Sequence, residues 1–333
     1  LNNKETFNDN NLNIIISSEN SSYERVTINE NINLENDTKN IVGIYDPEKN
    51  NLTIDMWSRT DGNELIDLLN KILEFNLSKD SNEILKIALL TNTYSPEKNI
   101  SFEEFIKFKI KWLIKYGDLN LIKEYLDKNN NLEINDNLIK HFVDQNLSKT
   151  DLNEACNIFN NNINTNNIYL LKFKIYCLIS DEKIEESLLH YDLLKETGFD
   201  DYFFEKRIFK LIGYEDTIDN QVNDTNILNF HLSHRLNEDF VYEPDISSSK
   251  LIWKYLSSAN LLSNIDDMDL NNKEKILALE KATHDKNFPE DQLFSIYEKF
   301  LFNINQYINI DEAYKLLSPV EGRALLYQGA LII

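Results

Sequence analysis

Two histidines three positions apart are the residues best spaced for metal chemistry in this chain. His231 and His234 would share one face of a helix, and a carboxylate from Glu238 or Asp239 could complete a metal site. The spacing lacks the pattern of zinc peptidases, in which the histidines lie four apart around an internal glutamate. A partly exposed polar helix face explains the pair more simply, so we expect neither a bound metal nor another cofactor.

The two cysteines offer a second kind of chemistry. Cys156 and Cys177 are separated by 21 positions, and no C-x-x-C or paired Cys/His run accompanies them, so the spacing does not predict a zinc site. If the cysteines lie on neighbouring helices, they could face each other and form one disulfide. The sequence favours the other interpretation, that both are small buried apolar side chains.

Catalytic and cofactor-binding motifs do not appear in the sequence. There is no G-x-S-x-G elbow, phosphate loop or dinucleotide fingerprint, and only 7 glycines are available to form such loops. Glycoside hydrolysis needs two carboxylates placed across a sugar, but 56 acidic residues allow such a pair to be drawn almost anywhere. We therefore predict a protein that is not an enzyme and binds no cofactor.

The charge balance narrows the class of partner. Lysine and arginine number 34 against 56 aspartates and glutamates, which gives a formal net charge of −22. Such a chain is poorly suited to bind DNA, RNA or anionic lipid, each of which attracts a basic surface. A basic or cationic partner would suit it, although solubility alone also explains an acidic surface. No stretch approaches the roughly 18 to 20 apolar residues of a membrane-spanning helix, so we expect no direct membrane insertion.

The elements that must position these residues are predicted to be helices. Only 7 glycines and 5 prolines occur in 333 residues, whereas β-sandwiches and doubly wound α/β folds use both heavily in turns. Between Leu65 and Leu73, leucine and isoleucine recur with the i, i+3, i+4, i+7 spacing of an amphipathic helix. Thr60 or Asp61 is placed to cap this helix.

A recurring aspartate turn indicates repeats. Asp118, Asp151, Asp181 and Asp216 each follow a helical segment, with spacings of 33, 30 and 35 positions, and Asp311 begins a similar segment near the C-terminus. A period of about 30 to 35 residues with two helices per unit is typical of paired-helix solenoids. Each aspartate is predicted to cap the second helix of its pair.

From about residue 100 to residue 330, this pattern resembles the tetratricopeptide-type helical repeats. The regular Trp, Gly, Tyr, Ala and Pro positions of that family are mostly absent, and Sel1-type or HEAT-like repeats fit the pattern as well. The segment from Gly43 to Leu69, with Tyr45-Asp46-Pro47 and Asp55-Met56-Trp57-Ser58-Arg59, is also similar to the opening of an uncharacterised group of exported bacterial helical proteins. The main resemblance implies an all-α fold, a right-handed α-solenoid of antiparallel helix pairs.

The chain is expected to have three parts. Residues 1–40 are Asn-rich and of low complexity, which predicts an extended or mostly disordered N-terminal arm. Residues 41–61 form a short non-helical entry segment. Residues 62–333 form the helical-repeat domain, with two sub-stacks that divide near residues 215–245.

We therefore predict a non-catalytic protein–protein interaction scaffold that uses the concave surface of a helical solenoid and favours a basic or cationic protein partner. The alternatives are the helical arm of a cell-envelope enzyme, similar to those of lytic transglycosylases, and a structural subunit of a larger envelope assembly. The Asn-rich start at Leu1 suits the mature end of an exported, periplasmic protein, with a cytoplasmic location as the alternative.

Overall fold

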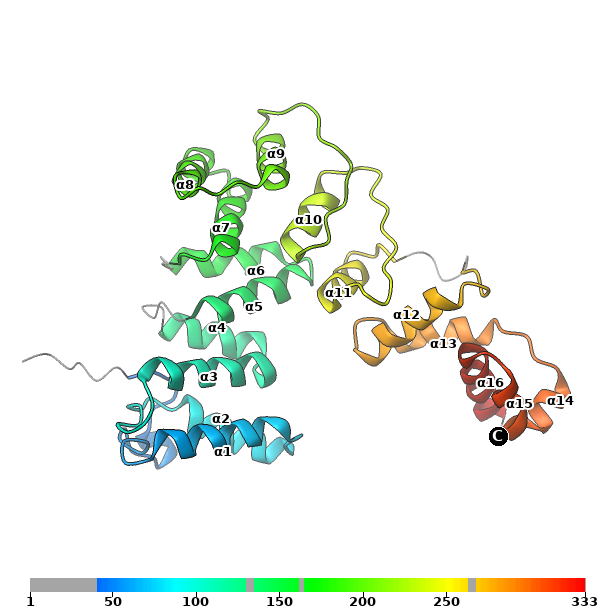
Figure 1. Cartoon of the computed structure of the whole chain (residues 1–333), viewed down its shortest axis with the longest axis horizontal. Coiled ribbons are helices and arrows are strands. Elements are labelled where there is room, and N and C mark those ends of the chain that lie inside the picture. Colours follow the sequence, from blue (N-terminus) through cyan, green and yellow to red (C-terminus); the bar gives the residue numbers. More distant parts are fainter. Residues whose placement is uncertain (1–40, 130–134, 162–164, 263–267, 333) are drawn as a thin grey trace, which may run out of the picture. The chain divides into compact units, whose positions relative to one another are not determined.

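A computed structural model describes residues 41–129, 135–161, 165–262 and 268–332 (Figure 1). Over these ranges the chain forms sixteen α-helices and no β-strand, so the predicted all-α class is confirmed. None of the helices in the same ranges is both long enough and apolar enough to cross a membrane. The predicted N-terminal arm, residues 1–40, lies outside the described residues.

The helices of the first part of the chain are α1 (Gly62–Glu74), α2 (Lys79–Leu90), α3 (Phe102–Tyr116), α4 (Leu119–Lys128), α5 (Asp136–Leu147), α6 (Leu152–Asn157), α7 (Ile168–Ser180), α8 (Ile184–Glu196) and α9 (Tyr202–Leu211). Those of the second part are α10 (Ile227–Arg235), α11 (Lys250–Ser258), α12 (Lys273–His284), α13 (Glu290–Glu298), α14 (Ile304–Ile308), α15 (Ile310–Leu316) and α16 (Pro319–Ile332). Short 3-10 turns occupy Glu48–Asn50 and Ile158–Asn161.

Three of the predicted aspartate caps are present. The Asp61 carboxylate accepts hydrogen bonds from the backbone N–H groups of Asn63 and Glu64 at the start of α1. Asp118 caps α4 and Asp151 caps α6 in the same way, with N···O distances of 2.8 and 3.0 Å. These carboxylates satisfy N–H groups that have no partner within the helix, which explains why helices begin at these positions.

The other predicted caps were wrong. Asp181 ends α7 instead of starting α8, because the turn closes through a backbone hydrogen bond from Lys183 to Leu178 and carries Glu182 at a positive φ of 62°. No helix follows Asp216 until α10 begins at Ile227. Asp311 lies within the first turn of α15, not at its cap. The regular aspartate spacing therefore continues along the sequence past Asp151, but the helix caps that it predicts do not.

A central row of helices, α3, α5 and α7, organises the first part of the fold. Each helix of the row contacts the next, and α4, α6 and α8 pack beside α3, α5 and α7 respectively (Figure 1). At the ends of the row, α1 contacts α3 and α9 contacts α7. Buried aromatic side chains fill the space between these helices, among them Phe105, Trp112, Phe142 and Phe173.

Helices α10 and α11 do not extend the row. Both return to contact α5, far back along the chain. The linker from α9 is held by Arg207, whose almost fully buried guanidinium donates to the Asp219 carboxylate and the Gln221 carbonyl, each at 3.0 Å. A second hydrophobic cluster, formed mainly by α12, α13 and α16, begins at Trp253 on α11. Helix α11 therefore joins the two clusters.

The entry segment, residues 41–61, contains no α-helix and is held by polar contacts from helices α2 to α4. The ammonium group of Lys109 on α3 donates to the Val42 carbonyl at 2.7 Å, and the Asn129 side chain bonds both the N–H and the carbonyl of Gly43. A Cβ atom on Gly43 would lie 2.6 Å from the backbone of Thr91, so only glycine allows this close approach.

The burial of Lys109 leads to a prediction about how the unfolding free energy depends on pH. The side chain is fully buried, and burial lowers the pKa of its ammonium group to about 7. Between pH 7 and about 10 the unfolded chain therefore binds more protons than the folded chain, so stability rises with pH. We expect Lys109 to raise the unfolding free energy by up to about 1.4 kcal/mol per pH unit in this window.

Urea unfolding of the wild type and Lys109→Met between pH 7 and about 9.5 measures this contribution, which should be absent from the variant. Lys128→Met is the matched control, because the Lys128 ammonium also donates to the entry segment, at the Ile44 carbonyl, but its side chain is half exposed. Parallel pH profiles for the wild type and Lys109→Met would show that the buried amine does not govern this dependence.

Candidate functional site

The histidine pair lies on α10, between α7 and α11. His231 is hydrogen-bonded through both ring nitrogens, Nε2 to the Tyr176 hydroxyl at 2.7 Å and Nδ1 to the Tyr255 hydroxyl at 2.9 Å. The same Tyr255 hydroxyl lies 2.8 Å from Nδ1 of His234. The guanidinium of Arg235 donates to the Tyr176 hydroxyl from the other side. This polar network links three helices through side chains alone.

Hydrogen-bond chemistry fixes one donor in this network. Arg235 can only donate, so the Tyr176 hydroxyl accepts its N–H. In either tautomer, His231 donates to one tyrosine hydroxyl and accepts from the other. Burial, the Arg235 charge and His234 lower the pKa of His231 to about 3, which keeps the ring neutral.

This arrangement explains the histidines without a metal. His231 has no ring nitrogen left to ligate an ion, because each one already faces a tyrosine hydroxyl. Within the described ranges, no group of three or more His, Cys, Asp or Glu side chains is placed to hold a metal ion. The pair instead docks α10 against its neighbours, a role that sequence spacing cannot distinguish from metal ligation.

A buried lysine adds a second polar contact between α10 and the central row. The Lys172 ammonium on α7 lies 2.6 Å from the Asp201 carboxylate and 3.4 Å from the Asn229 side-chain oxygen on α10. Burial opposes ionisation of Asp201, but the hydrogen bonds from Lys172 and from the Phe204 N–H bring its pKa below the ordinary value. Buried charges are tolerated only when paired in this way.

The two cysteines are joined by a disulfide bond in the structure. Helix α6 is a short element packed beside α7, which brings the Cα atoms of Cys156 and Cys177 to 5.5 Å. Both residues are buried, as the favoured interpretation expected, but they are not separate thiols. The bond links α6 to α7.

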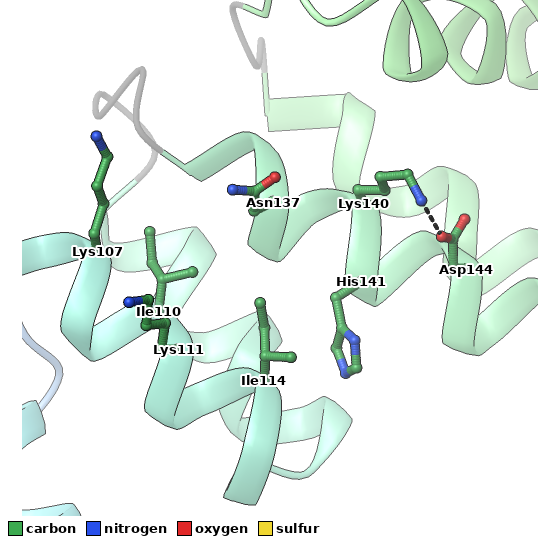
Figure 2. A pocket seen from close by; sticks show the side chains of 8 residues that line it. All are labelled: Lys107, Ile110, Lys111, Ile114, Asn137, Lys140, His141 and Asp144. Atoms are coloured by element: carbon green, nitrogen blue, oxygen red, sulfur yellow. Dashed lines mark hydrogen bonds and ion pairs between the residues drawn. The ribbon is translucent and has the colours of Figure 1, made fainter. Parts of the chain in front are cut away.

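The pocket with the clearest chemical character lies between α3 and α5. We call it the lysine pocket; it has a volume of about 450 Å³ and is lined by Lys107, Ile110, Lys111, Ile114, Asn137, Lys140, His141 and Asp144. Four side chains of α3 and four of α5 line it, each set with i, i+3, i+4, i+7 spacing (Figure 2). Each helix therefore presents a single continuous face to the pocket.

Three lysines and one aspartate line the lysine pocket. Lys140 pairs with Asp144 at 2.8 Å, and this almost fully buried carboxylate also accepts a 2.5 Å hydrogen bond from Tyr169. Lys107 pairs with Glu103 one turn away, where both side chains are more than half exposed. No ion pair joins Lys111 to another described residue. The pocket is therefore locally basic in an acidic protein.

Lys254 extends this basic character toward α11. The Lys254 ammonium donates to the side-chain oxygen of Gln145, the residue after Asp144, at 2.8 Å. Burial lowers the pKa of His141, and the charges of Lys254 and Lys140 add to the effect against the opposing influence of Asp144. Helix α11 thus borders the lysine pocket.

A second hollow, of about 260 Å³, continues from the lysine pocket toward α1. It shares Lys107 and Lys111 with the lysine pocket, but the carboxylates of Asp67 and Glu104 also line it. The excess of positive charge is therefore confined to the space between α3 and α5.

The corresponding face of α7 is covered by the chain itself. Tyr169, Lys172 and Tyr176 have i, i+3, i+7 spacing on α7, and α10 supplies partners to two of them, Asn229 to Lys172 and His231 to Tyr176. Helix α10 therefore covers part of α7, and α10 and α11 also contact α5, so the open part of the central row is the lysine pocket between α3 and α5.

The comparisons supply no relative from which a function could be transferred. No protein-family model, curated protein or solved structure matches this chain.

Sequence reasoning missed the lysine pocket, although a signal was present. Lys107, Ile110, Lys111 and Ile114 alternate cationic and apolar side chains along one helical face, next to a buried stripe that includes Phe105 and Phe108. A face of this kind is ambiguous, because exposed lysines on a helix usually serve only solubility. The facing residues of α5 make it a pocket, and their position depends on tertiary packing.

The disulfide leads to a prediction about stability. Replacing both residues, Cys156→Ala with Cys177→Ala, should lower the unfolding free energy by about 2 to 4 kcal/mol, because the unfolded chain loses the constraint of a closed loop. Denaturant unfolding with and without reductant measures the effect. Reductant should destabilise the wild type and leave the variant unchanged; a wild type that ignores reductant would contradict the expectation.

The neutral state of His231 leads to a prediction about acid stability. Since the folded pKa of about 3 lies below the ordinary value of 6.5, the stability contributed by the neutral ring is fully present above pH 6.5 and is lost as the pH falls toward 3. His231→Gln should remove this dependence, which amounts to up to about 1.4 kcal/mol per pH unit. Thermal or urea unfolding between about pH 7 and pH 4.5 tests it.

The exposed His284 on α12 provides the matched control for this measurement. His284→Gln should leave the wild-type acid profile unchanged. If His231→Gln and His284→Gln gave the same profile as the wild type, the histidine network would not contribute to acid sensitivity.

Proposed function

We propose that this chain is a non-catalytic protein–protein interaction scaffold, built as a degenerate tetratricopeptide-like α-solenoid with an N-terminal arm. The pairing of α3 with α4, α5 with α6 and α7 with α8, together with the row of contacts through α3, α5 and α7, supports this proposal. Solenoids present the faces of successive helices as one extended surface, which suits recognition of another protein.

One observation carries the proposal: α10 contacts both α5 and α7 and α11 contacts α5, whereas the lysine pocket between α3 and α5 stays open. The polar contacts of Lys172 and Tyr176 with α10 show how this face holds a helix. The open part keeps exposed polar side chains over the buried Ile110 and half-buried Ile114, a combination typical of binding surfaces.

Export to the periplasm remains part of the proposal, and the disulfide supports it. Disulfides form and persist mainly in oxidising compartments, whereas cytosolic thiols are kept reduced. The bond between Cys156 and Cys177 is buried and joins two packed helices, as expected for a structural disulfide rather than a catalytic one.

The net charge of the whole chain and the local charge of the lysine pocket favour partners with different charge distributions. The formal charge of −22 favours a basic or cationic partner at long range. At a salt concentration near 0.15 M the screening length is about 8 Å, so charges within the pocket dominate close contacts. A partner that fits both the net charge of the chain and the local charge of the lysine pocket carries little net negative charge overall and places a limited number of anionic groups at the pocket.

Site-specific photo-cross-linking tests the scaffold function. Benzoylphenylalanine replaces Asn137, which is exposed at the rim of the lysine pocket, or Lys79, which is exposed at the start of α2 and serves as the control. We expect cells of the source organism to give a defined protein adduct from position 137 and none from position 79. The adduct partner, identified by mass spectrometry and purified, should bind the wild type directly.

Asn137→Trp should then fill the pocket and weaken binding of the purified partner by at least about tenfold, while Lys79→Trp should not. Adducts that are equal at the two positions, or a partner that binds Asn137→Trp normally, would refute recognition through this face.

A further inference from the structure

We propose that the lysine pocket binds an acidic amphipathic helix of the protein partner, with carboxylates on Lys107 and Lys111 and an apolar side chain over Ile114. This inference rests on the proposed scaffold function and deepens it by naming the chemistry of the partner. It differs from the expectation based on net charge, which favours a basic partner.

Charge complementarity is the first argument. The pocket is lined by Lys107, Lys111 and Lys140, and Asp144, the one acidic residue that lines it, is already engaged by Lys140 and Tyr169. Among the described residues, Lys107 pairs with Glu103 alone, in an exposed i, i+4 ion pair that contributes little and is readily exchanged. Lys107 and Lys111 therefore remain available to carboxylates of a partner.

The spacing of these groups matches a helix. Lys107 and Lys111 lie one turn apart, about 6 Å along the α3 axis. Aspartate or glutamate residues at i and i+4 of a second helix have the same separation, so both ion pairs can form at once. Ile114 lies beyond the lysines on the same face and is half-buried, so it offers apolar contact to a side chain of the incoming helix.

The chain itself provides the precedent for a helical occupant. Helix α10 lies on the equivalent face of α7, and α11 reaches the end of α5 through the bond from Lys254 to Gln145. A partner helix in the lysine pocket would therefore lie beside α11 and continue a layer that two helices already form. An extended strand would instead need an exposed sheet edge, and the described ranges contain no strand.

The limits of the basic region favour a short acidic segment over a nucleic acid. Asp67 and Glu104 line the adjoining hollow, so a long polyanion that left the lysine pocket toward α1 would meet carboxylates. The net charge of −22 repels a polyanion as well. A helix with two or three carboxylates avoids both penalties.

Peptide binding provides the test. The probes are three pools of fluorescent peptides of about 18 residues, a length sufficient to form a helix. Every peptide has two chosen positions four residues apart, which carry Glu in the first pool, Gln in the second and Lys in the third. Within each pool, the apolar residue between these two positions is varied. Anisotropy titration measures their affinity for the wild type. We expect the Glu pool to bind at least about tenfold more tightly than the Gln pool, with an affinity that falls as salt rises.

Charge reversal with a matched control locates the binding. Lys107→Glu with Lys111→Glu should reduce binding of the Glu pool by at least about tenfold, whereas Lys49→Glu with Lys79→Glu, which makes the same change in net charge at exposed sites outside the pocket, should not. Far-ultraviolet circular dichroism of both double variants checks that the helices are retained.

The outcomes separate this inference from the scaffold function. If all pools bind equally and Asn137→Trp abolishes their binding, the scaffold surface stands and the acidic helix is refuted. Tighter binding of the Lys pool, or of a single-stranded oligonucleotide, also refutes it. If no pool binds, or Asn137→Trp leaves the binding of every pool unchanged, the acidic helix is refuted, and the scaffold function then depends on the result of cross-linking at position 137.

Discussion

The ring of His231, buried between two tyrosine hydroxyls, is the contact on which the arrangement of the binding face depends. A buried imidazole must find partners for both nitrogens, and here Tyr176 on α7 and Tyr255 on α11 provide them. Because these partners come from two other helices, α10 can satisfy the ring only by returning to the central row. The polar requirement of one side chain thus selects one docking position among the many that apolar packing alone would allow.

Buried basic side chains impose the same kind of constraint elsewhere in the fold. Lys109 donates to the Val42 carbonyl, Lys172 donates to Asp201, and Arg207 donates to Asp219 and the Gln221 carbonyl. In each case a basic group on a helix holds a segment that is not part of the helix row, either the entry segment, the start of α9 or the linker that follows it. Burial without a hydrogen-bond partner would be strongly unfavourable, so these side chains fix the position of the irregular segments more specifically than hydrophobic contacts could.

These contacts together decide which part of the central row remains open. With α10 and α11 held against α7 and the end of α5, the exposed face is reduced to the region between α3 and α5, where the charge is locally positive. The acidic character of the whole chain and the basic character of this face then act at different distances. Long-range repulsion discriminates against polyanions, while the pocket recognises a small number of carboxylates at contact distance.

The sequence alone was sufficient for the all-α class, the start of α1 and the caps at Asp118 and Asp151, because these depend on local periodicity and on hydrogen bonds within one turn. Asp181 and Asp216 were misjudged, since the same residue type also ends a helix or occupies a linker. The role of His231, the partners of Lys109 and the lysine pocket were decided only by the tertiary structure. Each involves side chains separated by 24 to 67 positions in the chain or faces of different helices, and local pattern contains no information about such pairings.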